Sequence, residues 1–149
     1  MIMYSRELTV AWGESDPFGL VYFPRMLAWF NDTEHEMLRA IGFATEKMIA
    51  KDRSAFVMGD IHFKFIGPAA YGDRVRTMIQ LSKITKSTLH WDCKAVQASS
   101  GALVCEGRAI RIHARIMEDG NLSAQPIPDD IRRALSVPGS LVNMDPVGQ

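Results

Sequence analysis

WGESDPFGLVYFP, residues 12–24, is the segment from which the architecture of the rest of the chain can be worked out. An alternating strand pattern stops within its acidic part, and a helix follows whose first turn holds the final proline. Pro17 fixes φ and removes a backbone donor, and Gly19 tolerates a positive φ, so both residues interrupt regular structure. The pattern therefore predicts that Asp16 lies on a tight loop immediately before a helix N-terminus.

A carboxylate at this place can serve chemistry or structure. The start of a helix presents unpaired N–H groups and a partial positive charge, which stabilise a carbonyl oxygen that gains negative charge during nucleophilic attack. A carboxylate beside such a donor is the minimum equipment for acyl transfer. The alternative is that Asp16 only caps the turn or the helix, and the local pattern alone favours this alternative because Asp-Pro and Gly are common in loops.

Length and composition limit the function classes. The 149 residues make one ordinary domain. Seventeen basic and seventeen acidic side chains leave no net charge, so no global field favours nucleic acid or an anionic membrane as a partner. Cys93 and Cys105 lie in apolar runs, and neither they nor the four histidines have metal-ligand spacing. We expect no metal, reduced thiols, and a cytoplasmic protein without a signal peptide or a membrane span.

Hydrophobic periodicity predicts a single α+β domain over residues 1–136, followed by a loosely ordered tail over 137–149. The apolar face of the first strand runs from Tyr4 to Trp12, and a central helix spans 24–41 and ends at Gly42. The apolar arc of this helix is too wide for one flat neighbour and indicates a curved antiparallel sheet around it. The other expected elements are a short helix over 45–52, capped by Thr45 with Met48 and Ile49 facing inward, strands over 55–66 and 102–116, strands with apolar faces at 75–81 and 89–95, and a helix over 128–135.

Two polar residues disturb the apolar arc of the central helix. Glu34 falls inside the arc, and Asn31 lies on its edge. A carboxylate among apolar neighbours needs a partner or a function, because desolvation penalises its charged form. The pattern leaves two interpretations of Glu34 open, a partly exposed residue paired with an arginine or a functional carboxylate.

The chain resembles the 4-hydroxybenzoyl-CoA thioesterase family of hot-dog-fold enzymes. The resemblance is carried by an aromatic-x-acid-x-Asp-x-x-Gly-x-Val-aromatic-aromatic pattern at Trp12, Glu14, Asp16, Gly19, Val21, Tyr22, Phe23 and Pro24, and continues through Trp29, residues 36–39, 55–57 and 68–73. It covers the chain up to Leu135. It implies a hot-dog fold, with a five-stranded antiparallel sheet wrapped around the long central helix.

The resemblance also implies an acyl-CoA thioesterase that needs no cofactor, since coenzyme A is part of the substrate. In such an enzyme Asp16 attacks the thioester carbonyl or acts as a general base, and the backbone N–H of Phe23 is the oxyanion donor. A sister group of hot-dog thioesterases uses a glutamate on the central helix, which makes Glu34 the reserve catalyst. The substrate contacts that the resemblance implies are Gly19, Tyr22, Asn31 and Asp60.

Glu14 and Asp60 each have a simpler interpretation. Glu14 raises the proton affinity of Asp16 if both face one pocket, but the pattern favours the simpler interpretation, a solvated loop residue. Asp60 follows Gly59 within a strand, and such a glycine often marks a bulge.

Binding of coenzyme A requires cations for its phosphates. Lys86 and Ser87 match a basic-Ser turn that in the family lies near the nucleotide end of coenzyme A, and Lys83 is close by. The simpler interpretation of these residues is ordinary surface. A second candidate is the strand face of Arg111, His113 and Arg115, which equally suits an intersubunit face.

The acyl group and the assembly stay open. The enzyme that names the family recognises a phenolic hydroxyl with a helical aspartate, and Asn31 stands at that position here. An asparagine can still form a hydrogen bond but is not an anionic acceptor, so an aromatic acyl-CoA such as a benzoyl-CoA derivative is one candidate, and short-chain, medium-chain and other aromatic acyl groups are also open. The resemblance implies a homodimer or a dimer of dimers, that is, a homotetramer, with sites at the interface. The alternative function is a non-catalytic acyl-CoA binding or regulatory protein that has kept the fold.

Overall fold

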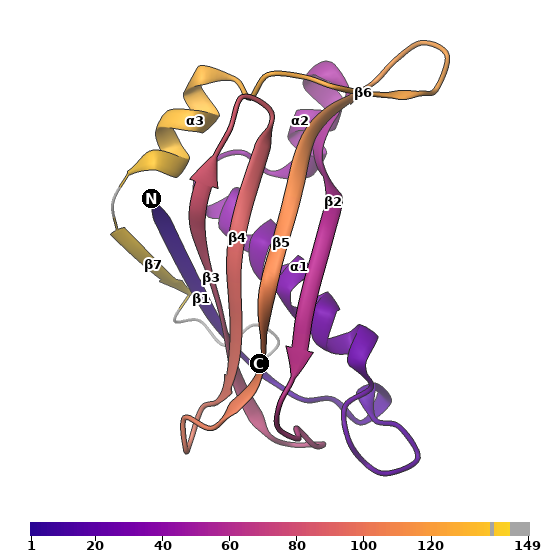
Figure 1. The fold of residues 1–149 in the computed structure, drawn as a ribbon, viewed down its shortest axis with the longest axis vertical. Coiled ribbons are helices and arrows are strands. Elements are labelled where there is room, and N and C mark those ends of the chain that lie inside the picture. The colour runs from indigo at the N-terminus through magenta and orange to yellow at the C-terminus, as the bar shows by residue number, and fades with distance from the viewer. Residues whose placement is uncertain (138, 144–149) are drawn as a thin grey trace.

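The computed structural model describes residues 1–137 and 139–143. It shows one twisted sheet with a long helix across one of its faces (Figure 1). The strands follow the order β2-β5-β4-β3-β1-β7, and β6 pairs with β5. All pairings are antiparallel except β1 with β7, which is parallel. The elements are β1 (Ile2–Thr9), a 3-10 turn (Trp12–Glu14), α1 (Phe23–Ala40), α2 (Thr45–Asp52), β2 (Ser54–Phe65), β3 (Arg74–Ile84), β4 (Thr88–Gln97), β5 (Leu103–Ile116), β6 (Leu122–Ala124), α3 (Asp129–Ser136) and β7 (Gly139–Asn143).

The core lies between α1 and the face of the sheet that it crosses. The apolar faces predicted for β3 and β4 are both buried there, and the side chain of Trp91 on β4 is almost completely enclosed. Thr33 of α1 and Thr77 of β3 share a buried hydrogen bond of 2.7 Å, so the two polar groups at this helix–sheet contact satisfy one another. This arrangement confirms the predicted hot-dog fold, but the sheet has seven strands rather than the five expected, because β6 pairs with β5 and β7 pairs in parallel with β1.

Local sequence signals predicted both ends of α1 to within one residue. Gly42 adopts a φ of +92°, as a residue just past a helix end commonly does. Its N–H donates to the carbonyl oxygen of Arg39, and the Phe43 N–H donates to that of Leu38, which together form a Schellman motif. The helix therefore ends where the sequence predicted.

Several local predictions were wrong. Trp12 lies in the 3-10 turn and is 72% exposed, because β1 ends at Thr9 and the strand alternation does not reach it. The N-cap of α2 is Ala44, without a side-chain hydrogen bond, rather than Thr45. Ile49 is 45% exposed instead of facing inward, whereas Met48 is buried.

The two edges of the sheet differ. One edge strand is β7, which pairs in parallel with β1 and lies within the tail expected after residue 136; residues 138 and 144–149 are outside the described part of the chain. The other edge strand is β2, whose register against β5 shifts between Met58 and Asp60. The bulge predicted near Gly59 is therefore present. No helix among the described residues is long and apolar enough to cross a membrane.

Candidate active site

The loop between the 3-10 turn and α1 is closed by the Asp16 side chain. Its Oδ1 atom accepts hydrogen bonds from the backbone N–H groups of Phe18, at 2.8 Å, and Leu20, at 3.2 Å. The Asp16 N–H donates to the carbonyl oxygen of Leu20, and Gly19 adopts a φ of +76° at the turn. One carboxylate oxygen therefore has the capping role that the sequence favoured, and Oδ2 contacts no donor among the described residues.

Glu14 attaches this loop to the central helix. Its Oε1 atom accepts the Ala11 N–H at 2.8 Å, and its Oε2 atom accepts the indole N–H of Trp29 at 2.7 Å. Its carbonyl oxygen also accepts the N–H of Tyr22, the N-cap of α1. The interpretation of Glu14 as a solvated loop residue was therefore wrong. This link joins residues 15 positions apart, and the only sequence signal for it was an indole on an apolar helix face that needs an acceptor.

The first N–H of α1 belongs to Phe23, as predicted. It donates to no acceptor among the described residues, and the first turn of the helix contains no acidic residue that would offset the positive end of the dipole. The flanking aromatic rings are packed on one another, with 5.5 Å between the centroids of Tyr22 and Phe23 and 5.8 Å between those of Phe23 and Phe65. An oxyanion placed here would meet an unpaired donor beside apolar surface.

Glu34 lies about three helical turns further along α1 and is buried. Its Oε2 atom accepts the Nε–H of Arg111 on β5 at 2.9 Å, and both side chains are less than 10% exposed. The Nη2 atom of Arg111 donates to Oδ1 of Asn31 at 2.7 Å. Burial raises the pKa of Glu34 above its ordinary value, and the Arg111 guanidinium opposes that rise. Glu34 therefore has the arginine partner that one interpretation required, but it is buried rather than partly exposed.

The second candidate for the phosphate site, the strand face of Arg111, His113 and Arg115, is mostly buried. Arg111 and His113 are buried on the face of β5 that meets α1, and only Arg115 is exposed. Ile110 and Ile112, which alternate with these residues along the strand, lie half-buried instead of forming the core face. The sequence signal was Arg111 itself, because an arginine in a strand that also carries apolar residues indicates that the strand face is buried and that the arginine has a partner there.

Lys86 and Ser87 lie in the turn between β3 and β4, and Lys83 lies near the end of β3, at the end of the sheet opposite the Asp16 loop (Figure 1). The loop contacts the chain just before β3 begins, where the Val21 N–H donates to the carbonyl oxygen of Ala69. The 11 residues of β3 separate the two places by roughly 35 Å at the usual rise per residue. One chain does not bring these lysines to Asp16.

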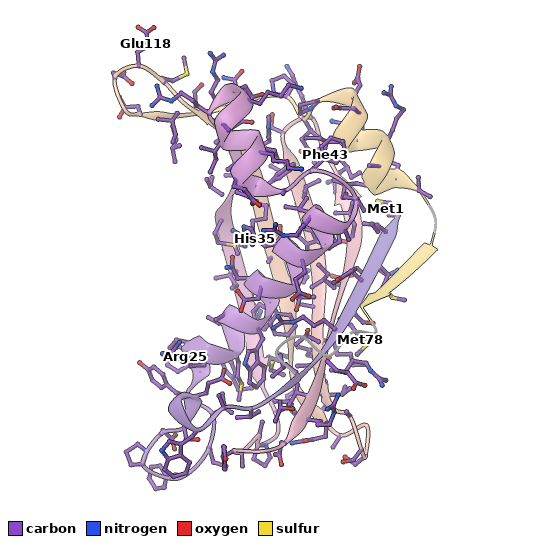
Figure 2. The ribbon with its side chains drawn as sticks, turned by 180° about the vertical axis from the view of Figure 1, so that it is seen from behind. Met1, Arg25, His35, Phe43, Met78 and Glu118 are labelled. Atoms are coloured by element: carbon purple, nitrogen blue, oxygen red, sulfur yellow. The ribbon has the colours of Figure 1, made fainter. Side chains whose placement is uncertain are left out.

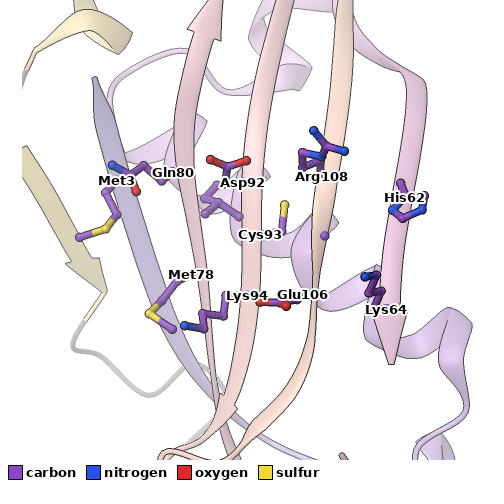
Figure 3. Close-up of a pocket in the computed structure, with 12 residues that line it drawn as sticks. Met3, His62, Lys64, Met78, Gln80, Asp92, Cys93, Lys94, Glu106 and Arg108 are labelled. Carbon is purple, nitrogen blue, oxygen red and sulfur yellow. The ribbon is translucent and has the colours of Figure 1, made fainter. Parts of the chain in front are cut away.

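Asp60 is exposed and lines one of two hollows on the face of the sheet that α1 does not cover. One of them, of about 390 Å³, is lined by Asp60, Lys83 and His90 among others. The other, of about 500 Å³, is lined by charged side chains of both signs, including Lys64, Lys94, Asp92, Glu106 and Arg108 (Figure 3). Figure 2 shows α1 on the far side of the sheet from this face, with Arg25 near its start. Within one chain Asp60 is therefore not brought to the Asp16 loop.

A family model described as the thioesterase-like superfamily matches residues 10–135. Among solved structures, a 1,4-dihydroxy-2-naphthoyl-CoA thioesterase from Synechocystis is 19% identical with a TM-score of 0.80, over 89% of this chain and 95% of that chain. The 4-hydroxybenzoyl CoA thioesterase from Pseudomonas sp. strain CBS-3 is 16% identical with a TM-score of 0.81, over 89% of this chain and 98% of that chain. A gentisyl-coenzyme A thioesterase is 21% identical with a TM-score of 0.78, over 89% of this chain and 99% of that chain. At these identities the likeness shows that the fold is shared.

Proposed function

The chain belongs to the thioesterase-like superfamily, and we propose that this thioesterase hydrolyses an acyl-CoA with the Asp16 carboxylate and the Phe23 backbone N–H. The observation that carries the proposal is the pairing of two groups at the start of α1. One is an unpaired helix N–H, and the other is a carboxylate whose loop is fixed to the same helix through Glu14 and Trp29. Preorganised donors and a held carboxylate are what acyl transfer requires.

In the proposed reaction the thioester carbonyl oxygen accepts the Phe23 N–H and keeps that hydrogen bond as it becomes negative. Asp16 then takes one of two roles through its unoccupied Oδ2. It attacks the carbonyl carbon and expels coenzyme A as the thiolate, leaving a mixed anhydride that water hydrolyses, or it removes a proton from the water that attacks. Both routes end in a free acid and coenzyme A.

Glu34 is the other carboxylate that this fold offers for the reaction. Its Oε2 atom already accepts the Arg111 Nε–H, and its side chain is enclosed between α1 and the sheet. Removing one member of a buried ion pair leaves an uncompensated charge, so such a group is suited to holding its partner in place. We therefore assign the chemical step to Asp16 and keep Glu34 as the carboxylate that takes over if Asp16 proves dispensable.

The phosphates of coenzyme A are proposed to bind Lys83, Lys86 and Ser87 of a second copy of the chain. Within one chain these residues are separated from Asp16 by the length of β3. The edge strand β2 offers a place for the second copy, because its outer positions include exposed apolar side chains such as Ile61 and Phe65. We therefore expect a homodimer or a dimer of dimers. A monomer by light scattering at assay concentration would contradict this proposal.

The test of the proposed function is thiol release from a panel of acyl-CoAs. Benzoyl-, 4-hydroxybenzoyl-, naphthoyl-, butyryl- and octanoyl-CoA are incubated with the protein, and the coenzyme A thiol is detected with Ellman's reagent. We expect turnover of at least one aryl substrate. Binding by calorimetry without turnover of any of them would instead support a non-catalytic acyl-CoA binding protein. That second function is favoured by one observation, that Oδ1 of Asp16 already serves its own loop.

A further inference from the structure

One edge of the sheet is closed by a strand from the C-terminal part of the same chain. The five residues of β7, Gly139–Asn143, pair in parallel with Ile2–Arg6 of β1. On its other side β1 pairs with β3, so without β7 it would be the outermost strand of the sheet. Figure 1 shows β7 beside β1 on one side of the sheet and β2 on the opposite side. β7 therefore decides whether the main-chain groups of β1 are open to another strand.

The family match and the proposed reaction do not account for β7. The family model matches residues 10–135, and β7 begins after this region, at Gly139. The contacts that hold the Asp16 loop to the rest of the chain involve Ala11, Trp29 and Ala69. None of these residues lies in β7, so the proposed reaction gives this strand no role.

The part of β1 that β7 covers lacks the features that usually protect an edge strand. Such strands are protected by charged side chains, prolines or bulges. Ile2–Ser5 contains no charged side chain and no proline, and the register of β1 against β3 runs without a shift. Charges begin at Arg6, where β7 ends, and the next residue, Glu7, forms ion pairs with two arginines of β3. β7 therefore covers the unprotected part of β1.

The other edge strand, β2, has the protection that β1 lacks. Its register against β5 shifts between Met58 and Asp60, and it carries the exposed charged side chains of Asp60 and Lys64. Its outer side pairs with no strand of the described residues. The chain therefore has one edge that is protected but open, and one that is unprotected but covered by β7.

The number of open edges determines which assemblies can form. A two-fold axis pairs like surfaces, so a chain that associates through one edge closes as a dimer. A chain that associates through both edges has a free edge after every step, and the array grows without closing. Covering one edge is therefore sufficient to keep an assembly of such sheets finite.

We propose that the outer side of β1 is a strand-addition surface for the β1 strand of a second copy, and that β7 occupies this surface and prevents the association. Two β1 strands paired antiparallel about Tyr4 place Ile2 opposite Arg6 and Met3 opposite Ser5, so no like charges meet. This inference goes beyond the proposed function and does not depend on hydrolysis. It does not depend on a dimer at β2 either, because it concerns one additional association step.

The test compares two truncated chains with the 149-residue protein. A chain that ends at Val137 lacks β7, whereas a chain that ends at Asn143 keeps it and is the matched control. Light scattering at equal concentrations gives the mass, and circular dichroism reports the fold. We expect the Val137 chain to reach at least about twice the mass of the 149-residue protein, and the Asn143 chain to match that protein. A folded Val137 chain without added mass would overturn the proposal.

Truncation also removes contacts that stabilise the fold, so a second change separates edge pairing from unfolding. Met3 is 36% exposed on the edge that the Val137 chain uncovers. Met3→Lys in this chain adds a charge of the kind that protects natural edge strands. We expect it to return the mass to that of the 149-residue protein without raising the Tm. Association that persists in this variant would come from exposed core residues and would refute the proposal.

The control for the added charge is Thr9→Lys in the Val137 chain. Thr9 is exposed on the same strand, but it lies beyond the segment that β7 covers. This variant should associate as the Val137 chain does. If it abolishes association as fully as Met3→Lys, the effect is one of net charge, and the assignment to the segment under β7 is wrong.

Hydrogen exchange identifies the strand that forms the new contact. The amides of residues 2–6 should exchange faster in the Val137 chain with Met3→Lys than in the 149-residue protein, because nothing then covers them. In the associated Val137 chain the same amides should regain protection. New protection confined to β2 would contradict the proposal. Failure to hydrolyse any acyl-CoA would refute only the proposed function, since the masses and the exchange rates are measured without substrate.

Discussion

Replacing Asp16 in two ways distinguishes its role in the loop from its role in chemistry. Asp16→Asn keeps an oxygen that can accept the N–H groups of Phe18 and Leu20, and removes the charge. Asp16→Ala removes both the charge and the acceptor. If the carboxylate performs the chemistry, the two variants should be almost equally inactive. If it only holds the loop, only the alanine variant should be impaired.

The magnitudes follow from the two hydrogen bonds. At roughly 0.5–1.5 kcal/mol net for each, less in a partly exposed loop, their loss in Asp16→Ala costs about 1–2 kcal/mol. For a domain of this size that corresponds to a fall in Tm of roughly 3–6 °C. Asp16→Asn should stay within about 2 °C of the wild type. The kcat of both variants should fall by about 10²–10⁴-fold or more, the range for loss of a general base or nucleophile.

The assay is thiol release from the best acyl-CoA of the panel, with Tm measured by circular dichroism on the same samples. Asp119→Asn is the matched control, because Asp119 accepts the Asn121 N–H at 2.9 Å in an exposed turn of the same kind, in the loop between β5 and β6. It should leave turnover unchanged. Near-normal turnover in Asp16→Asn would refute the reasoning and transfer the role to Glu34. Activity lost only in Asp16→Ala would show that loop geometry, not the carboxylate, matters.

Three further predictions rest on other contacts. Trp29→Phe removes the indole N–H that Glu14 accepts at 2.7 Å, so we expect roughly tenfold lower kcat from a loosened loop; an unchanged kcat in the thiol-release assay would show that the link is dispensable. Burial raises the pKa of Cys93 and of Cys105 to about 12, so neither thiol should be alkylated by iodoacetamide in the folded protein, and intact mass should show two additions only after denaturation. Gly107→Ala would place a Cβ atom 2.1 Å from a backbone carbonyl oxygen of β2, so the strands must separate and Tm should fall by at least about 6 °C; a smaller fall would mean that the sheet adjusts easily.

Local signals in the sequence predicted the parts of the site that depend on neighbours in the chain. The bend at Pro17 and Gly19, the helix that follows it and the stop at Gly42 all depend on conformational preferences of a few adjacent residues. The structure confirms each of them within a residue or two. The unpaired N–H at the helix start is a consequence of the same local rule, since every helix leaves its first donors unsatisfied.

Local signals of this kind could not predict which partners the polar side chains contact. Glu34 and Arg111 are 77 positions apart, and nothing in the pattern near either residue indicates the other. The only signal was a charged group within an apolar face, which indicates that the group needs a partner. The sheet register decides which charges meet, and it is set by the whole fold. Trp12 shows the opposite error, because a local alternation was extended past the end of its strand.

The structural role of Asp16 and the chemical role proposed for it are compatible because they use different oxygens. Two backbone N–H groups hold Oδ1, which fixes the plane of the carboxylate and leaves Oδ2 directed by that plane. A group whose orientation is set before substrate arrives needs no reorganisation during the reaction, which is how preorganised sites gain rate. The loop is in turn fixed to α1 by Glu14 and Trp29, and α1 supplies the Phe23 N–H. The carboxylate and the proposed oxyanion donor therefore lie on segments that these hydrogen bonds join, so we expect their separation to vary little between the free and the substrate-bound protein.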